Sequence, residues 1–292
     1  MFNKKIRKNI INIMYIPALI LFTIFVFYPF FRGILISFTN WNGFSQHYNS
    51  VGLENYKNII ISDLNVRMAL KNTLIYGLGS TILQQILGLG YALFLNSDFR
   101  GRNFVRTVIY LPVMISGLIM GYMWYFIFKY DGTLAELFSI FGIKELNLLA
   151  NGNISIFLLT FINSVQYCGI SMLIYLAGLQ NIPKMYYEAS EIDGATSLQK
   201  FMYITIPMLR PAIITSFTIN LIGGLKLFDV IKALTNGGPG YATHSLSTLI
   251  DKVYFGTQNA GYSAAIGVVL FMFILISSLI TNQISKRGEL DL

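Results

Sequence analysis

Six long apolar stretches dominate the pattern of hydrophobic and polar residues along the chain. A helix needs about 20 predominantly apolar residues to cross the hydrocarbon core of a bilayer, and each stretch has roughly that length or more. The pattern therefore predicts an all-α, polytopic membrane protein with six transmembrane helices. The predicted spans are Ile11–Phe38, Asn72–Leu95, Thr107–Phe128, Ile154–Leu179, Pro211–Leu234 and Tyr262–Thr281.

The composition supports this prediction and excludes other classes of protein. Hydrophobic residues make up 54% of the 292 residues and charged residues only 12%, whereas a soluble domain carries roughly 25% charged residues. The first stretch follows a basic start, as a signal peptide does, but it is too long and lacks a small-x-small cleavage site. We therefore expect it to be an uncleaved first span.

The distribution of basic residues predicts the orientation. The N-terminal segment, the tail and the loops 96–106 and 180–210 together carry 12 Lys and Arg, and the remaining loops carry 6. Because Lys and Arg accumulate on the cytoplasmic side, both termini are predicted to be cytoplasmic. The net charge of +8 is thereby explained without a nucleic-acid partner.

The loops and spans show little other organisation. Residues 39–71 and 134–149 contain amphipathic segments, which predict short helices at the outer membrane surface. Gly117-x-x-x-Gly121 in the third span allows a neighbouring helix to approach closely. Since no internal repeat or soluble domain is found, residues 1–292 are predicted to form one transmembrane domain.

Catalytic and nucleotide-binding chemistry is not recognisable in the sequence. There is no G-x-x-x-x-G-K-[ST] loop, so we expect ATP to bind elsewhere. His47 and His244 are isolated from Cys and carboxylates, and we interpret them as solvated residues of outer loops. The single cysteine, Cys168, lies in an apolar stretch. We expect neither an active site nor a bound metal or other cofactor in this chain.

The loop between the fourth and fifth spans carries its own folding signals. Pro183 suits a helix start, and Gly194 suits the C-terminal cap of the helix that follows. Thr196-x-x-Gln199 is a capping box that opens a second helix, which Pro207 and Pro211 are expected to end. The pattern predicts a cytoplasmic helix–turn–helix hairpin. Its apolar residues indicate a docking surface; they are Met185, Tyr186, Tyr187, Ile192 and Phe201.

This hairpin resembles the EAA loop that marks permease subunits of binding-protein-dependent ABC importers. The usual pattern is E-A-A-x-x-x-G, nine variable residues, then I-x-L-P. Here Ser190 replaces the second alanine and Ile206 replaces the leucine before Pro207. The segment from Leu227 to His244, with T-N-G-G-P at Thr235–Pro239, resembles carbohydrate permeases, in particular the larger permease of maltose transporters. Val51–Lys57 is also similar to this group.

The resemblance implies a mechanism and a set of partners. Two unlike permeases form the path, two ATPase domains bind ATP and Mg beneath them, and an external solute-binding protein delivers the solute. The complex would lie in the cell membrane of a bacterium. The hairpin would pass closure of the ATPase dimer to the spans. The residues implied in this coupling are Met185, Tyr187, Glu188, Ala189, Asp193 and Gly194.

Polar residues within the later spans are candidates for the solute path, because polar groups at membrane depth usually face a cavity or a partner. The candidates are Asn163, Gln166, Tyr167, Ser216, Asn220, Gly224, Lys226 and Asp229. In the resemblance, Gly223-Gly224 falls where relatives place a further polar contact. Lys226 and Asp229 also have the i,i+3 spacing of an intrahelical ion pair, and each amide or hydroxyl could instead bridge two helices.

The prediction from these observations is a permease subunit of an ATP-driven sugar importer, with an oligosaccharide as the solute. An importer for glycerol phosphate or a polyol is the first alternative. An ion-coupled secondary transporter is the second, but it predicts an inverted repeat that is not found.

Overall fold

The computed structural model describes residues 15–142 and 147–289, with side chains up to Gln283. Within these ranges the regular structure is helical, apart from an isolated bridge between Thr39 and Ser50. The predicted all-α class is confirmed. Residues 11–14 of the predicted first span and 143–146 of the predicted outer segment lie outside the described residues.

Five helices of the described residues are long and apolar enough to cross a membrane. They are Tyr15–Ile36, Leu64–Asn96, Gly152–Gln180, Ser197–Leu234 and Ala260–Gln283. A sixth candidate consists of two helical segments, Arg102–Met114 and Gly117–Ile140, that are bent by 96° at a short break. The chain is therefore a multi-pass membrane protein with up to six spans.

The predicted third span, Thr107–Phe128, is not one unbroken helix. The helix α6 (Arg102–Tyr110) is followed by the 3-10 turn η4 (Leu111–Met114), and α7 (Gly117–Phe128) starts after an extended residue, Ile115. Pro112 lies in η4 and has no backbone N–H to continue the helix. The side-chain amide of Gln166 donates to the carbonyl of Ile115 at 3.0 Å, which satisfies a backbone acceptor released by the break.

The chain divides into two compact units, which are described separately. The first comprises residues 1–63 and 250–269. Its described elements are η1 (Thr23–Phe27), α2 (Tyr28–Ile36), α3 (Glu54–Lys57), η2 (Asn58–Ser62), η7 (Lys252–Gly256) and the first turns of α15 (Ala260–Glu289). The hydroxyl of Tyr262 donates to the carboxylate of Asp63 at 2.8 Å. The amide nitrogen of Asn55 donates to the carbonyls of Ser37 and Thr39.

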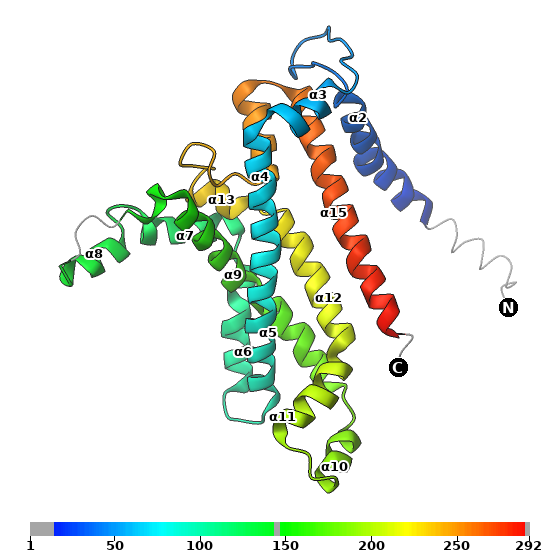
Figure 1. Ribbon diagram of the computed structural model, residues 1–292, viewed down its shortest axis with the longest axis vertical. Helices are drawn as coiled ribbons and strands as arrows, with labels where there is room; N and C mark the ends of the chain where they lie inside the picture. Colours follow the sequence, from blue (N-terminus) through cyan, green and yellow to red (C-terminus); the bar gives the residue numbers. More distant parts are fainter. Residues whose placement is uncertain (1–14, 143–146, 290–292) are drawn as a thin grey trace, which may run out of the picture. The chain divides into compact units, whose positions relative to one another are not determined.

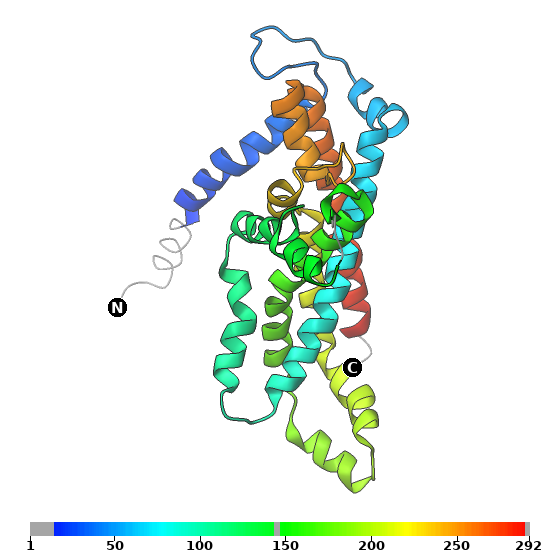
Figure 2. The same cartoon turned by 90° about the vertical axis from the view of Figure 1, so that its left-hand side faces the viewer.

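The second unit, residues 64–249 and 270–292, contains most of the helices. It begins with α4 (Leu64–Leu74), η3 (Ile75–Gly79) and α5 (Ser80–Asn96), which form one helical rod. The long α9 (Gly152–Gln180) packs along α5, and α6 lies beside α9 (Figures 1 and 2). The remaining helices are α8 (Thr133–Ile140), α10 (Lys184–Ile192), α11 (Ser197–Lys200), α12 (Ile206–Leu225), α13 (Asp229–Leu234) and α14 (Leu246–Asp251).

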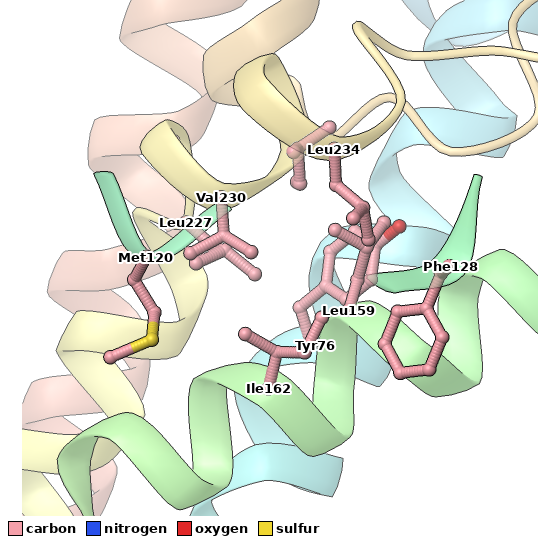
Figure 3. Close-up of a cluster of buried hydrophobic side chains, with 9 residues drawn as sticks. Tyr76, Met120, Phe128, Leu159, Ile162, Leu227, Val230 and Leu234 are labelled. Carbon is pink, nitrogen blue, oxygen red and sulfur yellow. The ribbon is translucent and has the colours of Figure 1, made fainter. Parts of the chain in front are cut away.

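An apolar core holds α7, α9 and α13 together (Figure 3). Gly117 and Gly121 lie on the face of α7 that meets α13, where a Cβ on Gly121 would stand 2.6 Å from the Cβ of Ala233. The predicted close approach at this pair of glycines is confirmed. The buried residues of the cluster are Tyr76, Met120, Phe128, Leu159, Ile162, Leu227, Val230, Ile231 and Leu234.

The helix after the hairpin does not end at Pro207 or Pro211, contrary to the prediction. It runs from α11 through the π-helical turn η6 (Phe201–Thr205) into α12. Pro207 falls in the first turn of α12 and Pro211 inside it. A proline inside a membrane helix is tolerated because neighbouring groups satisfy the freed backbone acceptors.

Candidate functional site: a polar cavity and a capped hairpin

A cavity of about 280 Å³ lies in the second unit, between α5, α7, α9 and the segment from α12 to α13. Its wall combines apolar and aromatic side chains with three amides, one cation and one anion, and ligand pockets commonly have such a mixed lining. The lining residues are Gln84, Gly117, Asn163, Tyr167, Ile170, Ile219, Asn220, Gly223, Gly224, Lys226, Leu227, Phe228, Asp229 and Val230.

A break between α12 and α13 shapes this cavity. The helix α12 ends at Leu225 and α13 begins at Asp229, so the intervening residues are not helical. The hydroxyl of Ser245 donates to the carbonyl of Leu227 at 2.7 Å, which replaces a helical bond there. Lys226 and Asp229 therefore lie on opposite sides of the break. No continuous helix joins Lys226 to Asp229, and both residues line the cavity.

Six of the eight predicted path residues line the cavity: Asn163, Tyr167, Asn220, Gly224, Lys226 and Asp229. Asn220 is buried, and its side-chain amide donates to the hydroxyl of Ser171 on α9 at 2.6 Å. Gly224 also has a packing role, because a Cβ there would stand 2.8 Å from the hydroxyl of Ser80.

The other two predicted path residues, Gln166 and Ser216, are buried away from the cavity lining. Gln166 holds the break between η4 and α7, as described above. Ser216 accepts a hydrogen bond from the side chain of Gln85 at 3.1 Å, and Gln85 accepts one from the hydroxyl of Tyr175. Ser216 thus joins α12 to α5 and α9 through a chain of hydrogen bonds.

Several lining residues were not predicted from the sequence. Gln84 is buried, and its side-chain nitrogen donates to the carbonyl of Asn163 at 3.1 Å. A polar residue within the apolar second span was the available signal for Gln84. Gly117 was expected only to allow a close helix approach, and Gly223 was noted only through the family resemblance; both line the cavity without a side chain.

The hairpin between α9 and α12 has the predicted geometry. The helix α10 ends at Ile192, and Gly194 adopts a left-handed backbone with φ +74°. Thr196 and Gln199 form the predicted capping box at the start of α11. The two helices are joined by an ion pair, in which the ammonium of Lys200 lies 2.7 Å from the carboxylate of Glu191. This ion pair lowers the pKa of Glu191 below its usual range, through hydrogen bonding first and charge second.

The predicted coupling residues are distributed over the exposed and the half-buried faces of this hairpin. Met185 is 66% exposed and Glu188, Ala189 and Asp193 are also exposed. Tyr187 is half-buried, and its hydroxyl lies 3.0 Å from that of Thr205 in η6. Tyr187 therefore connects α10 to the following helix and is less available for contacts outside the chain. The hairpin lies near the loop between α5 and α6 (Figures 1 and 2).

The T-N-G-G-P segment belongs to a loop between α13 and α14, whose residues 242–244 accept long-range hydrogen bonds. The side-chain amide of Asn72 donates to the carbonyls of Ala242 and His244. The hydroxyl of Tyr76 donates to the backbone carbonyl of Thr243. His244 is 4% exposed, and its ring lies against Gly237. The prediction of a solvated His244 is therefore wrong, whereas His47 is exposed as predicted. Within the described residues, no three His, Cys, Asp or Glu converge on a metal site.

A polar cavity among membrane-spanning helices is a feature that membrane transport proteins share. The sequence matches the family of binding-protein-dependent transport system inner membrane components over residues 71–288, about three quarters of the chain, and the chain belongs to this family. Members of this family are transport permeases and not enzymes.

Curated relatives and solved structures are similar over nearly the whole chain. The multiple sugar-binding transport system permease protein MsmF of Streptococcus mutans is 36% identical, with 94% of each chain covered. The arabinooligosaccharides transport system permease protein AraP of Bacillus subtilis is 33% identical, with 94% of this chain and 88% of AraP covered. One solved structure is a bacterial ABC transporter involved in the import of the acidic polysaccharide alginate. One of its chains superposes on this chain with a TM-score of 0.83 and is 25% identical in sequence. The match covers 97% of this chain and 98% of that one.

Proposed function

We propose that this chain is the permease subunit of an ATP-driven sugar importer, that its solute is an oligosaccharide, and that it forms half of the translocation path. The observation that carries the proposal is the cavity between α5, α9 and α12, which Gln84, Asn163 and Asn220 line with amide groups, in a chain 36% identical to a multiple-sugar permease. Amide groups next to aromatic rings are suited to sugar hydroxyls and to the apolar faces of sugar rings.

The proposed solute contacts come from α9, α12 and the break before α13. Asn163, Tyr167 and Asn220 supply an amide, a phenol and a second amide to the cavity. Lys226 and Asp229 add one positive and one negative group, so their formal charges cancel. A phosphate ester would favour an excess of cations, which argues against the glycerol-phosphate alternative. Gln166 and Ser216 are proposed to position helices rather than to contact the solute.

We propose that the capped hairpin couples the spans to a separate ATPase that binds ATP and Mg. Two short helices with a fixed turn transmit force better than a flexible loop does. Met185, Glu188, Ala189 and Asp193 offer exposed groups for this docking, and Gly194 sets the angle between α10 and α11. Tyr187 is proposed to anchor α10 through Thr205.

The proposed assembly contains a second, different permease, two ATPase domains and an external solute-binding protein. One related solved structure is an alginate ABC transporter in complex with a periplasmic protein that carries an alginate pentasaccharide. We place the complex in the cell membrane of a bacterium, with both termini cytoplasmic and residues 1–292 as one transmembrane domain. The excess of Lys and Arg in the loops 96–106 and 180–210 supports this orientation.

Uptake by the reconstituted complex tests the proposal. Vesicles that contain this chain and its copurifying subunits should take up neutral oligosaccharides only when ATP and the binding protein are present. Vesicles that lack the ATPase are the control. ATP-independent uptake driven by an ion gradient would contradict the proposal and favour a secondary transporter.

A further inference from the structure

A second cavity, of about 490 Å³, lies in the second unit between α4, η3, the start of α9 and the loop after α13. It shares no lining residue with the cavity of the candidate site. Its volume falls in the range of roughly 300–1,000 Å³ that is typical of ligand pockets. The lining residues are Met68, Lys71, Asn72, Ile75, Gly152, Asn153, Ile156, Phe157, Thr160 and Ala242.

This second cavity lies at the level where two membrane spans begin. Lys71 is the last charged residue before an uncharged run that extends to Ser97, and Asn153 lies in the first turn of α9, which carries no charged residue. Both helices are long and apolar enough to cross a membrane. A lysine at such an end extends its ammonium toward the headgroups. From Asn153 to Thr160 the wall continues about 10 Å along α9 toward the hydrocarbon, at a helical rise of about 1.5 Å per residue.

The headgroup end of the second cavity carries polar groups that the chain does not use. Lys71 and Asn153 are exposed, and neither the ammonium nor the side-chain amide makes a hydrogen bond or ion pair with another described residue. The neighbouring Asn72 differs, because its amide nitrogen holds the carbonyls of Ala242 and His244. Asn72 therefore fixes the wall, whereas Lys71 and Asn153 are available to a ligand.

The membrane end of the second cavity is apolar. Ile75, Ile156 and Phe157 line it, and the ring of Phe157 is 65% exposed although it lies within an uncharged span. An exposed apolar side chain at this depth is surrounded by hydrocarbon. The cavity thus combines a polar end at the level of the lipid headgroups with a wall suited to acyl chains.

Charge complementarity selects the kind of lipid. Among the described residues that line the second cavity, Lys71 is the only charged one. It complements the phosphate of a headgroup, and no carboxylate of the lining is present to balance a choline or ethanolamine ammonium. An anionic phospholipid such as phosphatidylglycerol therefore matches the lining better than a zwitterionic one. Its headgroup hydroxyls can bond the amide of Asn153.

We infer that the second cavity binds an anionic phospholipid, with the phosphate at Lys71 and the acyl chains along Phe157. One bound lipid would contact α4 and α9 together and so connect the starts of two spans. The inference goes beyond the proposed function, because it concerns the membrane and holds whichever solute is carried.

The test uses the complete importer in phosphatidylcholine nanodiscs that contain a photoactivatable phosphatidylglycerol. A parallel sample contains a photoactivatable phosphatidylcholine with the same acyl chains. After irradiation, peptide mass spectrometry locates the lipid adducts. The variants are Lys71→Gln, Lys71→Arg and Phe157→Ala, at positions exposed enough that folding should not change. The matched control is Lys57→Gln, because Lys57 is also an exposed lysine but does not line the second cavity.

We expect phosphatidylglycerol adducts on residues 68–75 and 152–160, in several-fold higher yield than phosphatidylcholine adducts. Lys71→Gln should lower the phosphatidylglycerol yield by about fivefold, the effect of one lysine at an anionic lipid surface. Lys71→Arg and Lys57→Gln should leave it unchanged. Phe157→Ala should lower the yields of both lipids, because it removes apolar wall and leaves the charge in place.

Four results would overturn the inference. Two of them are equal yields of the two lipids in the unmodified complex and an unchanged phosphatidylglycerol yield in Lys71→Gln. Loss of the second permease from the purified Phe157→Ala complex would assign this face to a subunit interface. Suppression of the adducts by a transported saccharide would assign it to the solute path. The labelling requires no transport, so its result does not depend on whether the proposed saccharide is taken up.

Discussion

The side-chain amide of Asn220 on α12 donates to the hydroxyl of Ser171 on α9, with the two atoms 2.6 Å apart. Asn220 is 4% exposed and lines the cavity, whereas Ser171 is fully buried. One residue thus joins two helices and presents a polar group to the cavity. The bond uses one of the two N–H donors of the amide, so the amide oxygen and the second N–H are not engaged by it.

The two roles of Asn220 can be separated by mutation. We expect Asn220→Leu to lower saccharide uptake by about tenfold or more, since it removes a polar contact from the cavity. Ser171→Ala should have a smaller effect, because it removes only a hydrogen bond between membrane helices, worth about 0.6 kcal/mol on average. The measurement is uptake at matched membrane levels. Equal losses in both variants would show that Asn220 acts only by joining the helices.

The angle of the coupling hairpin depends on the backbone of Gly194. A Cβ at this position meets no heavy atom within 4 Å, so Gly194→Val introduces backbone strain and no steric clash. The strain costs about 1–3 kcal/mol unless α10 tilts to relieve it. We expect normal insertion but weaker copurification of the ATPase and reduced uptake.

The matched control for this variant is Gly142→Val, outside the hairpin. Gly142 has φ +80° and equally open surroundings, so the same strain is introduced in a different loop. It should leave ATPase association unchanged. If Gly194→Val retains full uptake and ATPase copurification, coupling to the ATPase does not require the left-handed turn at position 194.

The ion pair between Glu191 and Lys200 should brace the same hairpin. Single charge reversals, Glu191→Lys or Lys200→Glu, are expected to uncouple ATP hydrolysis from uptake in part, and the double reversal should restore coupling. The exposed pair of Arg102 and Asp98, at 3.2 Å, is the control, and its reversal should be silent. If the double reversal couples ATP hydrolysis to uptake no better than the single reversals do, the ion pair does not stabilise the hairpin for coupling.

The pH dependence of this brace has a defined sign. The pKa of Glu191 is lowered by Lys200, so the contribution of the pair is complete above the ordinary carboxyl pKa. It is lost as the pH falls through the lowered pKa. Titration of Glu191 should therefore not change the coupling of ATP hydrolysis to uptake between about pH 6 and 8. Added salt at neutral pH should weaken coupling more in the unmodified protein than in a Glu191→Gln, Lys200→Gln variant.

Elements determined by local chemistry could be predicted from the sequence. The apolar runs identified the spans, and Gly194 with the Thr196 and Gln199 box identified the hairpin, because caps depend on residues only a few positions apart. The family signature in the hairpin added the expectation of a permease, which the family match confirmed.

Features determined by distant contacts could not be predicted in this way. The break after Leu225 contains no glycine or proline, and Ser245 satisfies the carbonyl of Leu227 from 18 residues away. The sequence also does not distinguish Asn220, which reaches the cavity, from Ser216, whose hydrogen-bond partner is Gln85 on another helix. Only the packing of the helices decides between these environments.

The last prediction concerns the loop that follows α13. Gly237 has φ +86°, and a Cβ on it would overlap the imidazole ring of His244, which is buried behind it. Gly237→Ala therefore combines backbone strain with displacement of a buried ring, and we expect it to destabilise the fold by about 2–5 kcal/mol. The measurement is the amount of protein in the membrane and its thermal unfolding in detergent.

Gly240→Ala, in the same loop, separates the two effects. Gly240 also has positive φ, at +61°, but no heavy atom lies within 4 Å of its Cβ position, so only backbone strain is expected. It should therefore lower the unfolding temperature less than Gly237→Ala does. The double variant Gly237→Ala, His244→Ala should recover part of the loss by removing the ring, although it also loses the contact between His244 and Thr248 at 3.0 Å. Equal destabilisation by Gly237→Ala and Gly240→Ala would show that backbone strain alone, and not the ring of His244, requires glycine at position 237.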